Sequence, residues 1–305
     1  MRPFPDTARI EVPRALASDL LAAARALPAH ENEAYYDDDA QQSVLDGLRG
    51  NCADGFDWLL DEIRLRLARA PFSAAVTGLE FDAENRLFIG LSRAFGQLVS
   101  RPLKKPRAQL VHYLHHRADL TSSRNGQVYS ESLHTDGAEW PEQVDMISMV
   151  CVRADGRGEG RSRLMDMYTI CREIRERFGA EVLQVLEDEP VPWLLAPGFD
   201  AEVVWRPVLG RDSICWRRYT IDFALARSGI EIPEHAAHAL NAVEAVISTT
   251  TSTHEWLMRP GEFTLVDNRK CLHARTAVSR RRPSRRLMVR AWVRARGEVP
   301  AGLQP

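Results

Sequence analysis

An alternating run close to the carboxyl end, RRLMVRAWVRA (residues 285–295), constrains the fold more than any other feature of the sequence. Apolar residues alternate along it with arginines, a methionine and a tryptophan. Successive side chains of a β-strand point to opposite faces, so this pattern predicts a strand with one apolar face. The segment EFTLVDN (residues 262–268), which follows a Pro260-Gly261 turn, predicts a second strand.

The rest of the chain is expected to form two unlike parts. Residues 1–100 contain apolar side chains at helical spacing and should be mostly helical. Residues 101–296 contain many short segments with strand propensity, and two helices are expected among them, at 167–188 and 233–247. This order predicts a mainly β fold of the α+β class, a β-sandwich or jelly-roll barrel with N-terminal and inserted helices. The sequence offers no clear boundary, so we expect a single domain over residues 1–305.

Four local predictions are more specific. Apolar residues at helical spacing from Phe88 to Leu98 predict one continuous helix. The segment ICWRRYT (residues 214–220) predicts a strand, and KCLHARTAVSRRRPS (residues 270–284) predicts a loop. The polar stretch ADLTSSRNGQ (residues 118–127) contains an Asn-Gly pair typical of a turn or loop, and it is a candidate lid over a site.

One short motif suggests metal chemistry. His134-Thr135-Asp136 places an imidazole and a carboxylate two positions apart, so on extended backbone both point to the same face and can hold one ion. His273, just beyond the strand at 262–268, supplies a second imidazole. Two histidines and one carboxylate form the facial triad of oxygen-activating non-haem iron(II) enzymes. A His-x-Asp motif also arises by chance in a chain with nine histidines, and alone it more often marks surface chemistry than a metal site.

The sequence after the motif favours the metal site. The segments LHTDGAEWPEQVDMISMVCVRADGRGEGRSRLMD and RPGEFTLVDNRKCLHARTAVSRRRPSRRLMVRAWVRA resemble the two signature regions of the taurine dioxygenase and clavaminate synthase-like family. These regions lie at roughly residues 129–167 and 259–296, about a third of the chain. The family pattern contains His-x-Asp/Glu, a glycine-rich turn with Ser or Thr, a strand ending in Asp-Asn-Arg, a distal His and Arg-x-x-x-Arg. All of these occur here in the same order.

The resemblance implies a double-stranded β-helix, a distorted cupin-like jelly roll, that carries an iron(II)- and 2-oxoglutarate-dependent dioxygenase. It implies that His134, Asp136 and His273 are the iron ligands. Arg286, the first arginine of Arg-x-x-x-Arg, matches the residue that binds the distal carboxylate of 2-oxoglutarate. Ser162 matches the hydroxyl that supports this carboxylate, although many family members have Thr there. Dioxygen completes the set of cosubstrates.

Arg290, the second arginine of the pair, matches a residue that contacts an anionic group of the substrate in several relatives. Arg286 and Arg290 project to one face of an alternating strand, with α-carbons about 13 Å apart at roughly 3.3 Å per residue. This spacing suits two anions on either side of a metal, and a guanidinium binds a carboxylate through paired hydrogen bonds. The same pattern would arise on an exposed edge strand, but the wholly apolar opposite face and the nearby His273 favour the binding role.

The resemblance implies hydroxylation of an unactivated C–H bond in a small anionic substrate, such as an amino acid or an intermediate of natural product biosynthesis. Related halogenases have a small residue in place of the carboxylate, so Asp136 argues against halogenation. Desaturation, cyclisation and epoxidation stay open as outcomes. Two other classes also stay open: a zinc-dependent hydrolase, which would leave Arg286 and Ser162 unexplained, and a non-catalytic metal-binding sensor on the same scaffold.

Composition and charge exclude several other classes. A formal net charge of −2 gives no basic field for nucleic acid, and the basic run SRRRPSRR lacks interleaved aromatic residues. No apolar run approaches the roughly 20 residues that cross a bilayer, and the N-terminus lacks the apolar core of a signal peptide. We therefore expect a cytoplasmic protein that binds neither nucleic acid nor membrane. Five widely spaced cysteines without a CxxC pair fit a reducing compartment, and the sequence does not indicate the oligomeric state.

Overall fold

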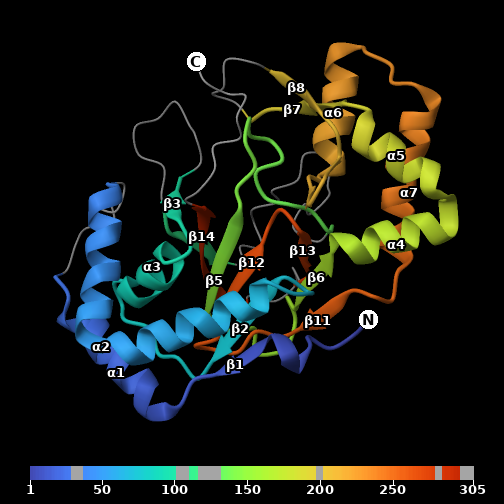
Figure 1. Cartoon of the computed structure of the whole chain (residues 1–305). Helices are drawn as coiled ribbons and strands as arrows, with labels where there is room; N and C mark the ends of the chain where they lie inside the picture. Colours follow the sequence, from blue (N-terminus) through green and yellow to red (C-terminus); the bar gives the residue numbers. More distant parts are fainter. Residues whose placement is uncertain (29–36, 101–109, 116–131, 197–201, 279–283, 296–305) are drawn as a thin grey trace.

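A large mixed sheet forms the centre of the protein. The computed structural model describes residues 1–28, 37–100, 110–115, 132–196, 202–278 and 284–295 (Figure 1). The strands of the large sheet are β1 (Arg9–Glu11), β2 (Ser73–Thr77), β3 (Gln97–Val99), β4 (His112–His115), β5 (Met146–Arg153), β12 (Phe263–Asp267) and β14 (Leu287–Arg294). They lie in the order β1-β2-β12-β5-β14-β3, and β4 pairs with β14 as well. Thus β14 is an inner strand and not an edge strand.

A smaller sheet faces the large one. It consists of β6 (Ser162–Asp166), β11 (His254–Trp256) and β13 (Cys271–Arg275), with β6 in the middle. Leu164 and Cys271 of this sheet share one buried cluster with Cys151 and Met288 of the large sheet. The two sheets therefore pack face to face around a common interior, as in a jelly roll.

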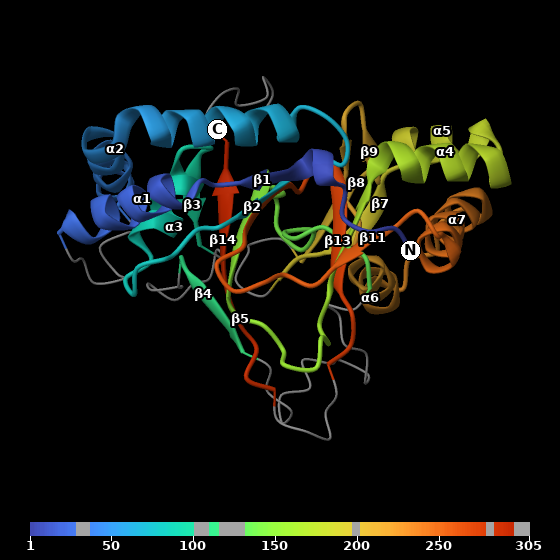
Figure 2. The same ribbon diagram turned by 90° about the horizontal axis from the view of Figure 1, so that it is seen from below.

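Two groups of helices flank the sheets (Figures 1 and 2). The first group contains α1 (Arg14–Ala26), α2 (Asp38–Leu67) and α3 (Arg86–Arg93), after a short 3-10 turn at Asp6–Ala8. The second contains α4 (Met167–Phe178), α5 (Ala180–Asp188), α6 (Arg218–Ser228) and α7 (Glu234–Thr249). Two short hairpins lie beside this second group, β7 (Val191–Leu194) with β8 (Val203–Arg206) and β9 (Leu209–Gly210) with β10 (Ser213–Ile214). Among the described residues, no helix combines the length and the apolar character needed to cross a membrane.

The alternation of β14 determines which of its faces meets the helices. Val289 and Ala291 pack into the core that also contains α1, α2 and α3. Met288 and Trp292, on the other face, belong to clusters in the interior between the sheets. Burying the apolar face against helices leaves the arginine-bearing face of the strand directed into the barrel. The pattern predicted from residues 285–295 is therefore observed.

The predicted helix from Phe88 to Leu98 is wrong in its second half. Helix α3 ends at Arg93, and Leu98 lies in β3, where it pairs with β14. Gly96 has a φ of 154°, and a Cβ at this position would collide with the carbonyl oxygen of Arg294. After α3 the backbone passes very close to β14 at Gly96. Only a glycine allows this approach, because any side chain would collide with the backbone of β14.

Three other local predictions need correction. Within residues 214–220 only Ile214 is in a strand, and α6 begins at Arg218. The expected loop at 270–284 contains strand β13, so His273 lies on a strand. The predicted helix at 167–188 is interrupted at Gly179, whose φ is 100°, whereas α7 matches the prediction for 233–247. The candidate lid at 118–127 lies outside the described residues.

Candidate metal centre

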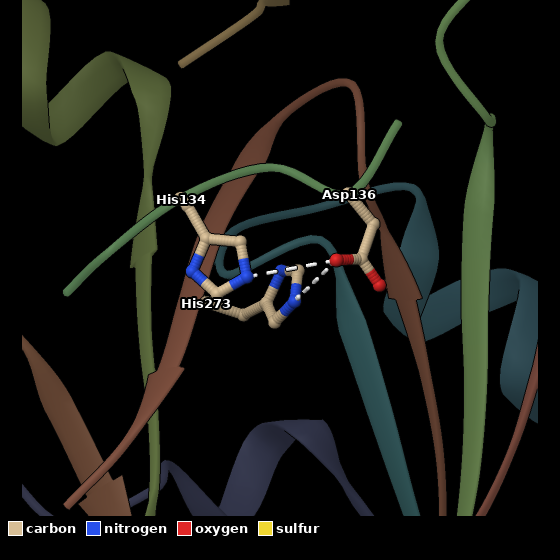
Figure 3. Close-up of side chains that lie close together, drawn as sticks. All are labelled: His134, Asp136 and His273. Atoms are coloured by element: carbon tan, nitrogen blue, oxygen red, sulfur yellow. Dashed lines mark ion pairs between the residues drawn. The ribbon is translucent and has the colours of Figure 1, made fainter. Parts of the chain in front are cut away.

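The structure brings the three predicted ligands together although β13 lies far along the chain from His134. His134 and His273 form an isolated antiparallel bridge, in which each backbone N–H donates to the carbonyl of the other at 3.0 and 2.8 Å. Residues paired in this way project their side chains to the same side. The two imidazole rings therefore lie with their centroids 4.6 Å apart (Figure 3).

Two neighbouring segments fix the backbone around Asp136. The buried side chain of Asn268, directly after β12, accepts from the backbone N–H of Asp136 at 2.9 Å and donates to its carbonyl at 2.9 Å. Thr135 N–H donates to the carbonyl of Trp216 at 2.8 Å, and Trp216 N–H donates to the Thr135 hydroxyl at 3.0 Å. The backbone of the His-x-Asp segment is thus held from both sides.

The three side chains direct their donor atoms at one point. Asp136 Oδ1 lies 3.5 Å from His134 Nε2 and 3.8 Å from His273 Nε2 (Figure 3). The ligand atoms of all three residues lie within 4.8 Å of one another. His134 Nδ1 lies 2.7 Å from the carbonyl oxygen of Ser132, which can only accept, so in the neutral ring the proton sits on Nδ1 and the lone pair on Nε2 faces the other two ligands. Two imidazoles and a carboxylate at this spacing fit a mononuclear iron(II) site with open positions.

The second oxygen of Asp136 has two donors of its own. Arg290 Nη1 lies 2.9 Å from Asp136 Oδ2, and Trp292 Nε1 lies 2.8 Å from the same atom. Both residues belong to the interior face of β14. One carboxylate oxygen therefore faces the histidines while the other is held by the strand, an arrangement that favours coordination through Oδ1 alone.

The protonation states suit a metal ligand set. Burial alone would raise the pKa of Asp136, but the charge of Arg290, followed by the contacts with the two histidines, holds this pKa well below its usual value. Burial, assisted by the charges of His134 and other neighbours, lowers the pKa of His273 to about 3. At neutral pH the site therefore presents an ionised carboxylate and a neutral His273 imidazole, the forms that bind metal.

Arg286 lies directly before β14 and is partly buried. Burial and then the positive charge of Arg275 lower the pKa of Arg286. Among the described residues, no carboxylate forms an ion pair with its guanidinium. Ser162 pairs with Arg275 across β6 and β13, so the Ser162 and His273 side chains lie on the same face of the small sheet. Arg286 is a half-buried cation beside a second cation, Arg275. A carboxylate of a dicarboxylate such as 2-oxoglutarate would neutralise this positive charge.

Comparison with known proteins establishes the family. The model of the family described as "Taurine catabolism dioxygenase TauD, TfdA family" matches residues 73–292. The chain belongs to this family. It is 31% identical over 157 residues to L-asparagine oxygenase of Streptomyces coelicolor, a match that covers 48% of this chain and 41% of that protein. The chain thus aligns with less than half of the length of this curated relative.

Solved structures of two oxygenases share the fold. One is asparagine oxygenase in complex with Fe(II), (2S,3S)-3-hydroxyasparagine and succinate, with a TM-score of 0.74 at 16% identity over 94% of this chain and 93% of that one. Another is the non-haem iron oxygenase OrfP in complex with Fe and α-ketoglutaric acid, with a TM-score of 0.70 at 16% identity over 94% and 93%. The predicted cupin-like jelly roll is therefore confirmed.

Family membership agrees with the class of enzyme that the sequence predicts. The family is described as one of dioxygenases. The match to a dioxygenase family gives no support to the two alternatives, a zinc-dependent hydrolase and a non-catalytic sensor. The roles of the individual site residues stay predictions.

Sequence reasoning missed three residues beside the predicted ligands. Trp292 shares its strand face with Arg290, and the alternation could have drawn attention to it. Glu139 and Arg217 form an ion pair at 2.6 Å close to Asp136, although 78 positions separate them. Nothing in the sequence connects these two, because their contact depends on how α6 packs against the His-x-Asp segment.

Proposed function

We propose that the protein hydroxylates an unactivated C–H bond of a free amino acid or a closely related small anionic metabolite. In this proposal His134, Asp136 and His273 hold the iron. The observation that carries it is the convergence of the donor atoms of these three side chains within 4.8 Å of one another. The carboxylate of Asp136 fills the position that a halogenase leaves open, which supports hydroxylation rather than halogenation.

The residues of the chain have distinct tasks in this proposal. Bound iron, together with 2-oxoglutarate and dioxygen, supplies the oxidation of the C–H bond. Arg286 binds the distal carboxylate of 2-oxoglutarate and Ser162 supports it, so the cosubstrate enters in one orientation. Arg290 and Trp292 hold the second oxygen of Asp136 and keep this ligand aimed at the metal.

The relatives support an amino acid as substrate. The asparagine oxygenase structure contains 3-hydroxyasparagine, and structures of OrfP contain hydroxylated arginine or L-canavanine. Their identity to this chain, 16%, is too low to transfer a particular amino acid. The proposal therefore extends to the class of substrate and leaves the side chain open.

The test is a search for product. The iron-loaded protein is incubated with 2-oxoglutarate and a pool of amino acids and other metabolites, and succinate and new masses are measured. We expect succinate release coupled to one compound that gains the mass of one oxygen atom. A compound that loses two hydrogens instead would indicate desaturation or cyclisation. Equal activity with zinc in place of iron, without succinate, would contradict the proposal.

We also propose a cytoplasmic location. All five cysteines are free thiols, and Cys151, Cys215 and Cys271 are buried. Burial raises the pKa of the Cys271 thiol well above its usual value, which keeps it unreactive. A chain with free thiols fits a reducing compartment.

A further inference from the structure

We propose that Asp155 and Ser284 position Arg286 for the distal carboxylate of 2-oxoglutarate. Asp155 lies in the glycine-rich turn between β5 and β6, and Ser284 lies two residues before Arg286. Both are positioning residues, because they act through Arg286 and not on the cosubstrate. This inference rests on the proposed function, in which Arg286 binds 2-oxoglutarate.

Ser284 connects Asp155 to the backbone of Arg286. Its hydroxyl donates to Asp155 Oδ2 at 2.5 Å, and its oxygen accepts from the backbone N–H of Arg286 at 3.2 Å. A serine hydroxyl has one proton to donate and lone pairs that accept, so Ser284 can make both hydrogen bonds at once. The position of the Asp155 carboxylate is therefore passed on to the backbone of Arg286.

The Asp155 carboxylate is itself held by its own turn. The side chain is 2% exposed, and its Oδ1 accepts from the backbone N–H of Arg157 at 2.8 Å. The backbone carbonyl of Asp155 accepts from the N–H of Gly158 at 3.1 Å. An aspartate that bonds to the backbone two residues further on closes a compact turn. Ser284 therefore donates to an acceptor that the turn keeps in one place.

The same turn also contacts the side chain of Arg286. A Cβ at Gly160 would lie 3.1 Å from both Cδ and Nε of Arg286, so the turn packs closely against the arginine. The end of the turn is tied to the segment after β13, because Gly160 N–H donates to the carbonyl of Ala277 at 3.4 Å and Arg161 N–H to the hydroxyl of Thr276 at 2.9 Å. The turn thus holds Arg286 at its backbone and along its side chain.

Asp155 supplies negative charge without taking the guanidinium of Arg286. Burial and the charge of Arg275 lower the pKa of Arg286, whereas the charge of Asp155 acts in the opposite direction. Oδ1 of Asp155 is engaged by Arg157 and Oδ2 by Ser284. In the part of the chain that the structure describes, the guanidinium of Arg286 forms no ion pair. It is therefore oriented in advance for a ligand carboxylate, and a group that is already oriented loses less entropy on binding.

The experiment compares two oxo acids that differ in the group that Arg286 would bind. The full chain with Fe(II) is titrated under nitrogen with 2-oxoglutarate or with 2-oxopentanoate. The second compound has the same chain length and the same chelating end, but a methyl group replaces the distal carboxylate. The Kd of each is measured from the visible charge-transfer band. In the wild type we expect 2-oxoglutarate to bind at least about tenfold more tightly than 2-oxopentanoate.

Ser284→Ala removes both of the hydrogen bonds that join Asp155 to Arg286. The Kd for 2-oxoglutarate should rise about 3–10-fold, the usual effect of a lost hydrogen bond, while the Kd values for 2-oxopentanoate and Fe(II) stay unchanged. Asp155→Ala should have the same selective effect. Ser284→Thr keeps a hydroxyl and should restore the binding of 2-oxoglutarate. A purely structural role would instead weaken both oxo acids alike.

Two substitutions on α6 serve as matched controls. Ser228→Ala removes a hydroxyl that donates to the carbonyl of Ala224, and Asp222→Ala removes the exposed partner of Arg218. Both residues belong to a helix outside the turn and outside the strands that carry the predicted cosubstrate residues. Both variants should keep the full preference of the wild type for 2-oxoglutarate.

Different results would overturn the inference and the function on which it rests. If the wild type prefers 2-oxoglutarate and R286A loses this preference while S284A keeps it in full, Arg286 binds the cosubstrate without help from Ser284, and the inference alone fails. Should D155A not fold, S284A decides, since it lacks only one oxygen atom. If the wild type binds both oxo acids equally, or gives no band with either, the proposed role of Arg286 fails as well.

Discussion

At the scale of single residues, the two oxygens of Asp136 have different partners. Oδ1 faces the imidazoles of His134 and His273, and Oδ2 accepts hydrogen bonds from Arg290 and Trp292. The His-x-Asp motif predicts that His134 and Asp136 face one ion, although Asp136 lies in a turn and not on extended backbone. The hydrogen bonds to Oδ2 depend on β14 passing beside the ligand, and no local pattern contains that information.

The indole of Trp292 should contribute to metal affinity. Trp292→Phe removes the donor to Asp136 Oδ2 but keeps a ring against Trp140 and His112. Loss of a hydrogen bond to a metal ligand typically costs about 10–100-fold in metal affinity, so we expect a weaker Fe(II) Kd in that range. The measurement is an anaerobic Fe(II) titration, with exposed Trp205→Phe as the control. Equal Kd values for W292F and the wild type would refute this role.

The partly buried His273 should make the metal-free protein less stable in acid. Its folded pKa of about 3 lies below the ordinary value of 6.5, so between these values the unfolded chain binds a proton that the folded chain does not. Stability is therefore retained above pH 6.5 and falls as the pH decreases towards 3, by at most about 1.4 kcal/mol per pH unit. Urea unfolding at pH 7.5 and 5.0 after chelation measures this slope.

A pair of histidine variants isolates this effect. The slope should be shallower in His273→Gln, which has no proton to bind at this position, and unchanged in His235→Gln, whose imidazole is exposed. Identical slopes in H273Q and the wild type would show that His273 does not contribute.

At the scale of elements, the sequence predicts those strands that contain a long apolar run or a clear alternation of apolar and polar residues. β12 and β14 have long apolar or alternating runs, and both appear where expected. β13 was missed because its five residues, CLHAR, are short, and it forms by pairing with β6. The start of α6 was missed because Ile214, Trp216 and Tyr219 favour strands by residue type, whereas Trp216 lies in the buried segment before the helix and Tyr219 lies in its first turn. Tertiary packing decided both cases.

The glycine-rich turn between β5 and β6 should matter for the cosubstrate. Gly160 has a φ of 67°, and a Cβ there would lie 3.1 Å from Nε of Arg286 and 2.9 Å from Val278. Gly160→Ala should therefore displace Arg286, raising the KM for 2-oxoglutarate several-fold, and cost about 1–3 kcal/mol through backbone strain. Gly156, in the same turn, has open space around it, so Gly156→Ala is the control. An unchanged KM in G160A would contradict this assignment of Arg286.

At the scale of the whole molecule, the helical part and the barrel share one core. Leu59 of α2 and Val289 of β14 belong to the same buried cluster, although they come from opposite ends of the chain. The sequence predicts both parts but not which face of the sheet the helices cover. We propose that they form a single domain, because neither can bury its apolar face without the other.

This proposal predicts one cooperative unfolding transition. Leu59→Ala leaves a cavity between α2 and the sheet and should lower stability by about 2–5 kcal/mol without splitting the transition. Leu65→Ala, on the exposed side of the same helix, should cost far less. Calorimetry of both variants measures the effect. Two separate transitions, with only one shifted in L59A, would contradict a single domain.

The most direct test of the central claim is anaerobic titration of the protein with Fe(II) and 2-oxoglutarate, followed by visible absorption. We expect the weak charge-transfer band of an iron(II)–2-oxo acid complex in the wild type. Asp136→Ala should abolish the band, because one of the three iron ligands is lost. Arg286→Ala should keep Fe(II) binding but need at least about tenfold more 2-oxoglutarate, since a charge-assisted contact is removed. A band of equal intensity and midpoint in all three proteins would contradict the account.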